Sequence, residues 1–207
     1  MTAKIVLALC ILWAALASVV QVLVARGSGR TDYAVRRGNP LRGIIYNFTV
    51  AMTPAHKESV RRHPFKFVVG VVMHIGVLVC LLGVLLLLVG PSAGVGVLAW
   101  ARPLAALSLL AGLYLLFRRC VDVNLRAMSC PDDYIAILAV CVLVAIVAFI
   151  PLGVIGQLVL LIYASVLFIY FPLGKLRHAV FFFVARADFG RRLGYRGTFP
   201  PVAGGLE

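Results

Sequence analysis

The stretch FVVGVVMHIGVLVCLLGVLLLLV, residues 67–89, decides the fold class of this protein. It contains no Asp, Glu, Lys or Arg, and its one strongly polar side chain is that of His74. A run of about eighteen or more apolar residues is long enough to cross the hydrocarbon core of a bilayer as a helix. The sequence therefore predicts a transmembrane helix here.

The whole chain has the composition of a membrane protein. Of its 207 residues, 63% are hydrophobic and 13% are charged, and the mean hydropathy is +1.05. Soluble globular domains are about half apolar and about a quarter charged. This composition excludes a soluble enzyme, a disordered tail and a secreted disulfide scaffold, and the length leaves room for about five membrane spans.

Five apolar runs predict five transmembrane helices. They cover residues 5–24, 67–89, 95–117, 134–150 and 154–184. The first run resembles a signal peptide in its position, but it is long for one and has no clear small-residue cleavage site after it. We therefore interpret it as a transmembrane helix.

The ends of the last two runs are informative. Ser129 is predicted to cap the fourth helix, because Pro131 suits a first turn and acidic residues follow it. As a single helix the fifth run, of about 31 residues, would be about 46 Å long and would exceed the hydrocarbon core. It should tilt or protrude, and Pro172 can kink it. The sequence leaves open whether this helix is continuous.

The basic residues predict the orientation in the membrane. The net charge is +13, from 20 Lys and Arg against 7 Asp and Glu. Only Lys4 and Arg102 lie outside three segments, residues 26–66, 118–126 and 175–196. Because positively charged loops are retained in the cytoplasm, we predict an all-α, polytopic membrane bundle of five helices with the N-terminus outside and the C-terminus inside.

This topology divides the chain into two parts. Residues 1–185 would form the membrane domain, with a basic cytoplasmic loop at 26–66, and residues 186–207 a basic cytoplasmic tail. Binding to nucleic acid is not predicted, because no aromatic-basic motif accompanies the charge. The five cysteines contain no C-x-x-C pair, so we predict neither a disulfide framework nor an iron–sulfur or zinc site.

Two histidines within the predicted spans are the candidate site. His74 and His178 lie about 10 and about 12 Å from the inner ends of their helices, counted at the helical rise per residue. Two imidazoles at matched depth on facing helices can hold one haem iron from both sides. Lys175 and Arg177 are candidates for contacts with the haem propionates. The alternatives are an interhelical hydrogen bond for each histidine and interface anchoring for the two basic residues.

The other polar residues receive simpler interpretations. His56 and His63 are expected at the surface of the basic loop, with His63 as a second-choice axial ligand. Arg102 is expected to extend to the membrane surface, and a contact with a quinone head group is the alternative.

Three short segments carry a resemblance to a known family. They are MHIGVL at 73–78, LRAMS at 125–129 and FPLGKLRH at 171–178. With histidines on the second and fifth helices, the chain resembles the cytochrome b (gamma) subunit of respiratory nitrate reductase and the related membrane subunits of heterodisulfide-reductase-like complexes. The segment at 52–59, MTPAHKES, looks more like the second branch.

The resemblance implies one b-type haem, with His74 and His178 as axial ligands. The nitrate reductase subunit carries four ligands for two haems, and the positions of its other two ligands correspond to Val84 and Leu160 here. Loss of both ligands of one haem is the pattern expected of a one-haem member. The family's quinone site cannot be transferred to particular residues of this chain.

The implied function is that of a quinone-reactive membrane subunit of a multi-subunit oxidoreductase. It would exchange electrons between membrane quinone or quinol and a cytoplasmic iron–sulfur partner, in the cytoplasmic membrane of a prokaryote. A non-haem membrane anchor or assembly subunit of a respiratory complex is the alternative. A small transporter is disfavoured, because it would show internal symmetry and polar groups at the membrane midplane, and the predicted spans have almost no midplane charge. A hydrolase is also disfavoured, because the sequence shows no Ser/His/Asp set at membrane depth and no H-E-x-x-H motif.

Overall fold

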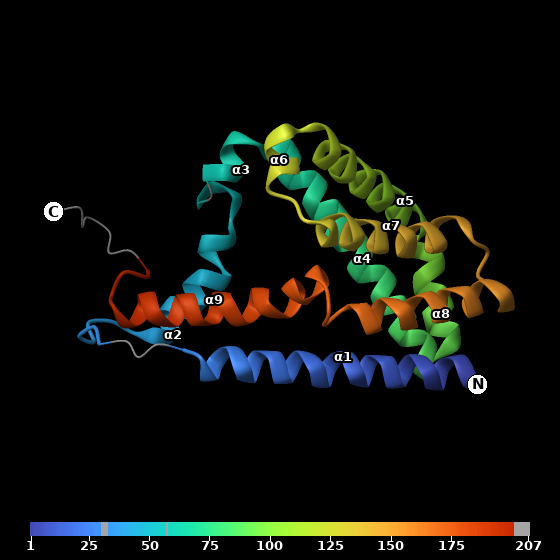
Figure 1. Cartoon of the computed structure of the whole chain (residues 1–207), viewed down its shortest axis with the longest axis horizontal. Coiled ribbons are helices and arrows are strands. Elements are labelled where there is room, and N and C mark those ends of the chain that lie inside the picture. The colour runs from blue at the N-terminus through green and yellow to red at the C-terminus, as the bar shows by residue number, and fades with distance from the viewer. Residues whose placement is uncertain (30–32, 57, 201–207) are drawn as a thin grey trace. The chain divides into compact units, whose positions relative to one another are not determined.

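The computed structural model describes residues 1–29, 33–56 and 58–200, and every regular element within them is helical (Figure 1). Parts of the predicted loop 26–66 and tail 186–207, namely residues 30–32, 57 and 201–207, lie outside the described residues. The helices are α1 (Thr2–Gly27), α2 (Pro40–Phe48), α3 (Glu58–Arg62), α4 (Pro64–Val89), α5 (Pro91–Val121), α6 (Val123–Ala127), α7 (Pro131–Phe149), α8 (Val154–Tyr170) and α9 (His178–Tyr195). Short 3₁₀ turns cover Val50–Met52, Pro54–His56 and Lys175–Arg177.

Four helices, α1, α4, α5 and α7, are each long and apolar enough to cross a membrane. A fifth crossing is counted if α8 and the segment Lys175–Tyr195 form one broken span. Many of their large apolar side chains point outward; Leu78 is 62% exposed and Trp100 89% exposed. A bilayer covers such surfaces, so the chain has the features of a multi-pass membrane protein.

The chain forms two compact units, and α1 contributes to both. The first unit is Met1–Ala17 with Phe65–Leu176, and the second is Ser18–Pro64 with Arg177–Glu207. The boundary predicted at residue 185 lies inside α9, which runs without interruption through Ala185 and Arg186.

In the first unit, glycines allow α4 and α5 to approach closely. A Cβ atom added to Gly76 would collide with the side chain of Ser108, and one added to Gly83 would lie 2.5 Å from Cγ of Leu98. The Ser108 hydroxyl donates a hydrogen bond to the Met73 carbonyl at 2.9 Å. Small residues and hydroxyl bonds of this kind join helices in apolar surroundings. The apolar core beside them is formed by α4, α5, α7 and α8, with one residue of α1.

The apolar run 154–184 is not one helix. The helix α8 ends at Tyr170, and the amides of Leu173 and Gly174 both donate to the Tyr170 carbonyl, at 2.9 and 3.0 Å, which closes a turn. Pro172 disfavours continuation of the helix because it has no amide hydrogen. Gly174 fits the turn because a Cβ there would collide with the Tyr170 ring.

The predicted cap of the fourth helix is also corrected. The residue before the helix is Cys130, whose amide donates to Asp133 Oδ2 at 2.9 Å. Ser129 lies one position earlier and donates instead to the Leu125 carbonyl at 2.6 Å. The acidic residues at the helix start are placed as expected for the positive end of its dipole.

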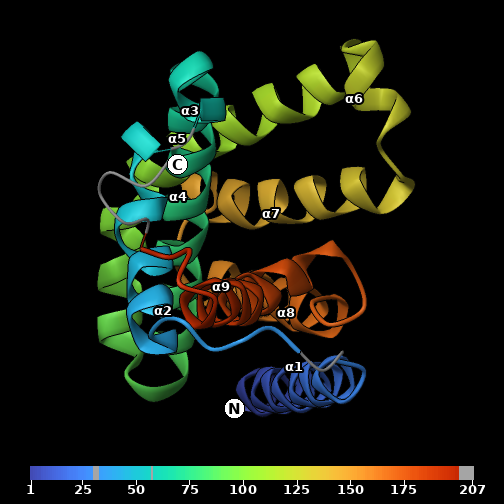
Figure 2. The same ribbon diagram turned by 90° about the vertical axis from the view of Figure 1, so that its left-hand side faces the viewer.

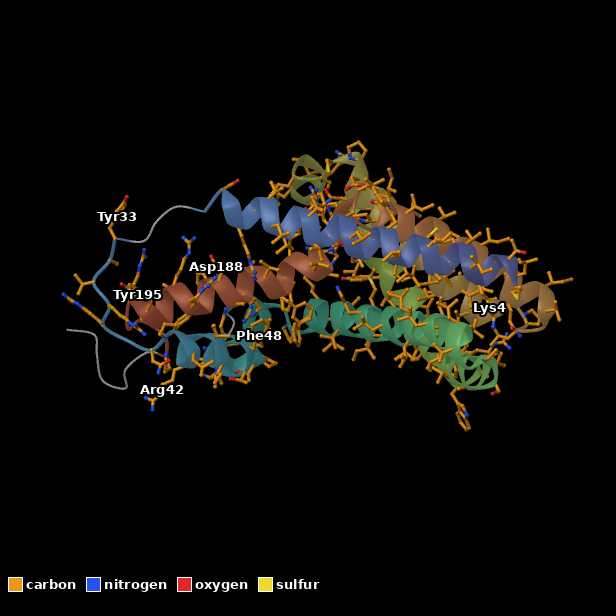
Figure 3. All side chains as sticks on the ribbon, turned by 90° about the horizontal axis from the view of Figure 1, so that it is seen from below. Lys4, Tyr33, Arg42, Phe48, Asp188 and Tyr195 are labelled. Carbon is orange, nitrogen blue, oxygen red and sulfur yellow. The ribbon has the colours of Figure 1, made fainter. Side chains whose placement is uncertain are left out.

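The second unit contains a helix pair that the sequence analysis treated as loop and tail. Figures 1 and 2 both show α2 alongside α9. The Asn39 side chain caps α2 by accepting the amides of Leu41 and Arg42, at 2.9 and 3.2 Å. Arg42 is exposed and points away from both helices (Figure 3).

Backbone contact between glycines holds this pair together. Gly43 of α2 meets Gly190 and Gly194 of α9, at positions four residues apart along α9. One turn further, Asn47 donates from Nδ2 to the Arg186 carbonyl at 2.6 Å. Arg186 in turn donates from Nε and Nη2 to the Asn47 carbonyl, at 3.1 and 2.6 Å. The second unit therefore has its own specific packing.

Candidate functional site

The imidazole of His74 is oriented by its own helix. Its Nδ1 lies 2.7 Å from the Gly70 carbonyl oxygen, one turn earlier in α4. A carbonyl can only accept, so Nδ1 carries the hydrogen and, in the neutral ring, Nε2 carries the lone pair. Metal-binding histidines commonly show this arrangement, with one nitrogen donating to a carbonyl and the other available as a ligand atom.

His74 lies on the face of α4 that points away from the core of the first unit. Its side chain is exposed, and so are its apolar neighbours Ile75 and Leu78. The opposite face, which includes Gly76 and Cys80, is buried in the first unit. An ionisable group at this depth of a span is costly in lipid and is a functional candidate by default. The ring therefore faces a surface that lipid, a cofactor or another chain would cover.

Gly76 and Gly83, which also lie on α4, do not widen the space beside His74. Their missing side chains admit α5, through Ser108 and Leu98. The two glycines therefore serve the approach of a neighbouring helix.

Apolar side chains occupy the two positions that the resemblance assigns to the ligands of a second haem. Val84 of α4 and Leu160 of α8 are both fully buried in the core of the first unit. Neither can ligate iron, and both contribute to packing.

His178 is the first residue of α9, and its side chain is exposed. It belongs to the second unit together with Arg177, whereas His74 and Lys175 belong to the first. The pairing of the two histidines thus stays a prediction. The predicted depth of His178 was counted from Arg186 back along the helix, and both residues lie in α9, so this depth also stays a prediction.

Lys175 is engaged in an ion pair that the sequence analysis missed. Its Nζ lies 3.2 Å from Asp133 Oδ1. Arg119, near the end of α5, approaches the same carboxylate at 3.6 Å and donates to the Ser129 hydroxyl at 2.7 Å. The Tyr170 hydroxyl donates to the neighbouring Asp132. Polar side chains therefore connect the end of α5, the start of α7 and the break after α8.

A signal for this cluster was present in the sequence. The two adjacent acids at the start of the fourth apolar run were explained by the helix dipole alone, although Arg118 and Arg119 follow the third run and Lys175 interrupts the fifth. Opposite charges at helix ends on one side of a bundle can pair, but the sequence does not identify which ends are neighbours.

Arg102, which was expected to extend to the membrane surface, is half-buried and bonded to a neighbouring helix. Its Nε donates to the Ala148 carbonyl at 3.2 Å, near the end of α7. The last carbonyls of a helix have no partner within the helix, and a guanidinium there is favourable. The two loop histidines are exposed, as predicted, and His56 Nδ1 lies 2.8 Å from the Thr53 hydroxyl.

No protein-family model, curated protein or solved structure matches this chain.

Proposed function

We propose that this chain is the membrane-anchoring electron-transfer subunit of a multi-subunit oxidoreductase. It exchanges electrons between membrane quinone or quinol and a cytoplasmic iron–sulfur partner through a single b-type haem. Five spans, with the N-terminus outside and the C-terminus inside the cytoplasmic membrane of a prokaryote, belong to the same proposal.

The observation that carries the proposal is the tautomer of His74 together with the exposure of its ring. Its hydrogen bond to the Gly70 carbonyl selects the tautomer in which Nε2 can bind iron. The ring is exposed on an apolar helix face, and a flat, apolar cofactor suits that face. His178 is the proposed second ligand, since its side chain is also exposed.

When bound, the haem supplies one-electron redox chemistry. The chain's own residues position it: the Gly70 carbonyl fixes the rotation of the His74 ring, and Arg177 and Lys175 are cations suited to propionates. Lys175 already shares Asp133 with Arg119, so Arg177 is the stronger candidate of the two. The basic inner segments, including Arg118 and Arg126, offer a positive surface to a partner or to anionic lipid.

The test is a reduced-minus-oxidised optical spectrum of the purified chain, with extracted haem counted per polypeptide. We expect a b-type spectrum and about one haem per chain. His74→Ala and His178→Ala should each lose the haem, and His56→Ala is the matched control because His56 is an exposed loop histidine. All variants are compared by gel filtration to confirm that they fold.

Full retention of haem in both variants would refute the ligand assignment. A chain without haem, prepared with adequate haem supply and its partner present, would favour the non-haem anchor or assembly subunit instead. Two haems per chain would contradict the role given to Val84 and Leu160.

A further inference from the structure

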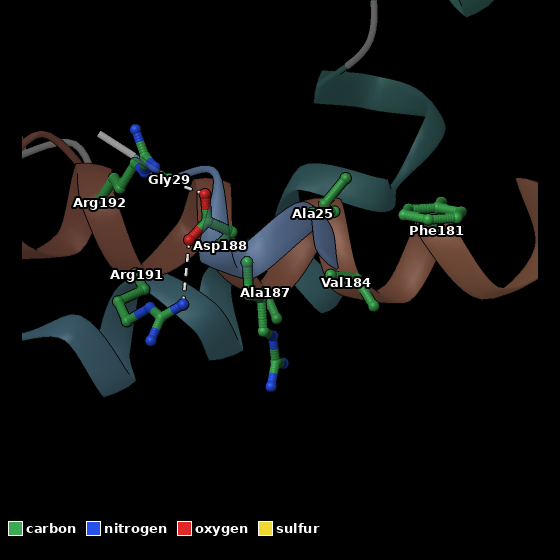
Figure 4. A pocket seen from close by; sticks show the side chains of 10 residues that line it. Ala25, Gly29, Phe181, Val184, Ala187, Asp188, Arg191 and Arg192 are labelled. Carbon is green, nitrogen blue, oxygen red and sulfur yellow. Dashed lines mark hydrogen bonds and ion pairs between the residues drawn. The ribbon is translucent and has the colours of Figure 1, made fainter. Parts of the chain in front are cut away.

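The second unit contains a groove between the end of α1 and the face of α9 that points away from α2 (Figure 4). It consists of two adjoining pockets of about 580 and 500 Å³ that share Ala25 and Phe181. All residues that line it belong to the second unit. The volume of each pocket is within the usual range for small-molecule sites.

One end of the groove is basic. Arg26, Arg191 and Arg192 line it, together with a single carboxylate, that of Asp188. Asp188 lies between two of them, 3.0 Å from Nη2 of Arg191 and 2.9 Å from Nε of Arg192 (Figure 4). One carboxylate cannot neutralise three guanidinium groups, so this end keeps a net charge of +2. Arginines arranged in this way are suited to phosphate oxygens.

The other end of the groove is mainly apolar. Val20, Val24 and Phe181 line it, and Arg177 is the charged side chain at this end. Since α1 has no charged residue between Lys4 and Arg26, and Arg26 lies in its last turn, the basic end of the groove lies where this span leaves the hydrocarbon. The apolar end then follows the span into the membrane.

A groove with one basic end and one apolar end fits an amphiphile better than a soluble anion. A free phosphate would use the arginines and leave the apolar walls uncovered. A phospholipid would use both ends, with its phosphate near the guanidinium groups and an acyl chain beside the valines. Basic pockets at the ends of transmembrane helices recognise anionic lipid head groups by the same electrostatics.

We propose that this groove is a binding site for an anionic phospholipid. The phosphate contacts Arg26, Arg191 and Arg192, and one acyl chain lies along Val24, Val20 and Phe181. The site uses neither His74 nor His178. It shares Arg177 with the haem proposal, at its apolar end, but the arginines proposed to contact the phosphate have no role in that proposal.

The test uses the full chain in a mild detergent and native mass spectrometry. The probes are phosphatidylglycerol and phosphatidylcholine with the same acyl chains, titrated separately. We expect the anionic lipid to bind at least tenfold more tightly. Loss of each arginine should weaken binding of the anionic lipid about fivefold, which is the effect of one basic residue near an anionic lipid surface.

The main variant is Arg191→Gln/Arg192→Gln. The matched control, Arg42→Gln/Arg61→Gln, removes the same charge from exposed residues of the same unit that do not line the groove. If the main variant fails to fold, Arg26→Gln tests the same site from α1. Phe181→Ala tests the acyl-chain end.

Each remaining outcome contradicts the proposal. Equal binding of the two lipids, or equal loss in the control variant, would show only diffuse attraction to charge. Displacement of the lipid by millimolar inorganic phosphate, with no effect of Phe181→Ala, would show a site for a soluble anion.

Discussion

Replacement of Gly43 by alanine should separate α2 from α9. The new Cβ would lie 2.6 Å from Gly194 Cα and 2.8 Å from its amide nitrogen, and it would also collide with the Gly190 carbonyl. Carbon atoms in contact are normally about 3.5–4.0 Å apart. Because all of these neighbours are backbone atoms, no side chain can rotate away, and the helices must move apart by about 1 Å.

We expect Gly43→Ala to weaken the docking of α2 on α9 by about 2–4 kcal/mol. Alanine in a helix is favoured over glycine by about 1 kcal/mol, but overpacking costs about 1–3 kcal/mol. The separation also breaks the reciprocal hydrogen bonds of Asn47 and Arg186 one turn away. Bonds to a charged group contribute about 1.5–3 kcal/mol, so the losses exceed the gain.

Hydrogen–deuterium exchange of the full chain in detergent measures this change directly. A loss of about 2–4 kcal/mol in the docking of α2 predicts amide exchange about 30-fold to 1,000-fold faster across Pro40–Phe48. The control is Gly27→Ala, in the same unit, because a Cβ at Gly27 would meet nothing within 4 Å. Unchanged or slower exchange in α2 would refute the packing argument, since helix propensity alone predicts slower exchange.

Three further predictions test other parts of the structure. Asp133→Asn weakens two ion pairs and the start of α7, so we expect a loss of about 1–2 kcal/mol, seen as a lower Tm in detergent; an unchanged Tm would show that the cluster is energetically neutral. Gly76→Ala should lower the Tm as well, by at least as much, because its Cβ would meet the Ser108 side chain; an equal or higher Tm would contradict close packing of α4 on α5. Cys120 is exposed and Cys141 buried, so a membrane-impermeant maleimide should label Cys120 in inverted vesicles and leave Cys141 unlabelled; labelling of Cys120 only in right-side-out vesicles would reverse the proposed topology.

The membrane-helix class was predictable because it depends on hydrophobicity summed along the chain, which needs no knowledge of tertiary contacts. A charge-free run such as residues 67–89 is apolar wherever it folds, and its length alone is sufficient to cross a bilayer. The helix α4 covers this run. The break in the last run was less certain, because proline can either kink or end a helix; Gly174 beside the Tyr170 ring favours the end.

The α2–α9 pair was missed because its signal is neither apolar nor periodic enough to stand out. Gly43 and Asn47 are buried in α2, yet glycine and asparagine read as loop residues in sequence. Their role follows from the spacing of Gly190 and Gly194 on another helix, far away in the chain. For the candidate site, sequence identified His74, but only the structure showed that its Nδ1 is bonded to Gly70.

The close union of α4 and α5 has a consequence for how the protein enters the membrane. The two helices are joined by Gly90 alone, and residues 67–101 contain no Asp, Glu, Lys or Arg. In the proposed topology, a hairpin of this kind can be inserted as one piece, with its turn crossing the bilayer without the cost of about 2.5–3.5 kcal/mol that each buried cation carries. Arg102 is the first residue that meets this cost, and the Ala148 carbonyl offers it a partner only after α7 has arrived. Insertion of the hairpin therefore precedes its final anchoring.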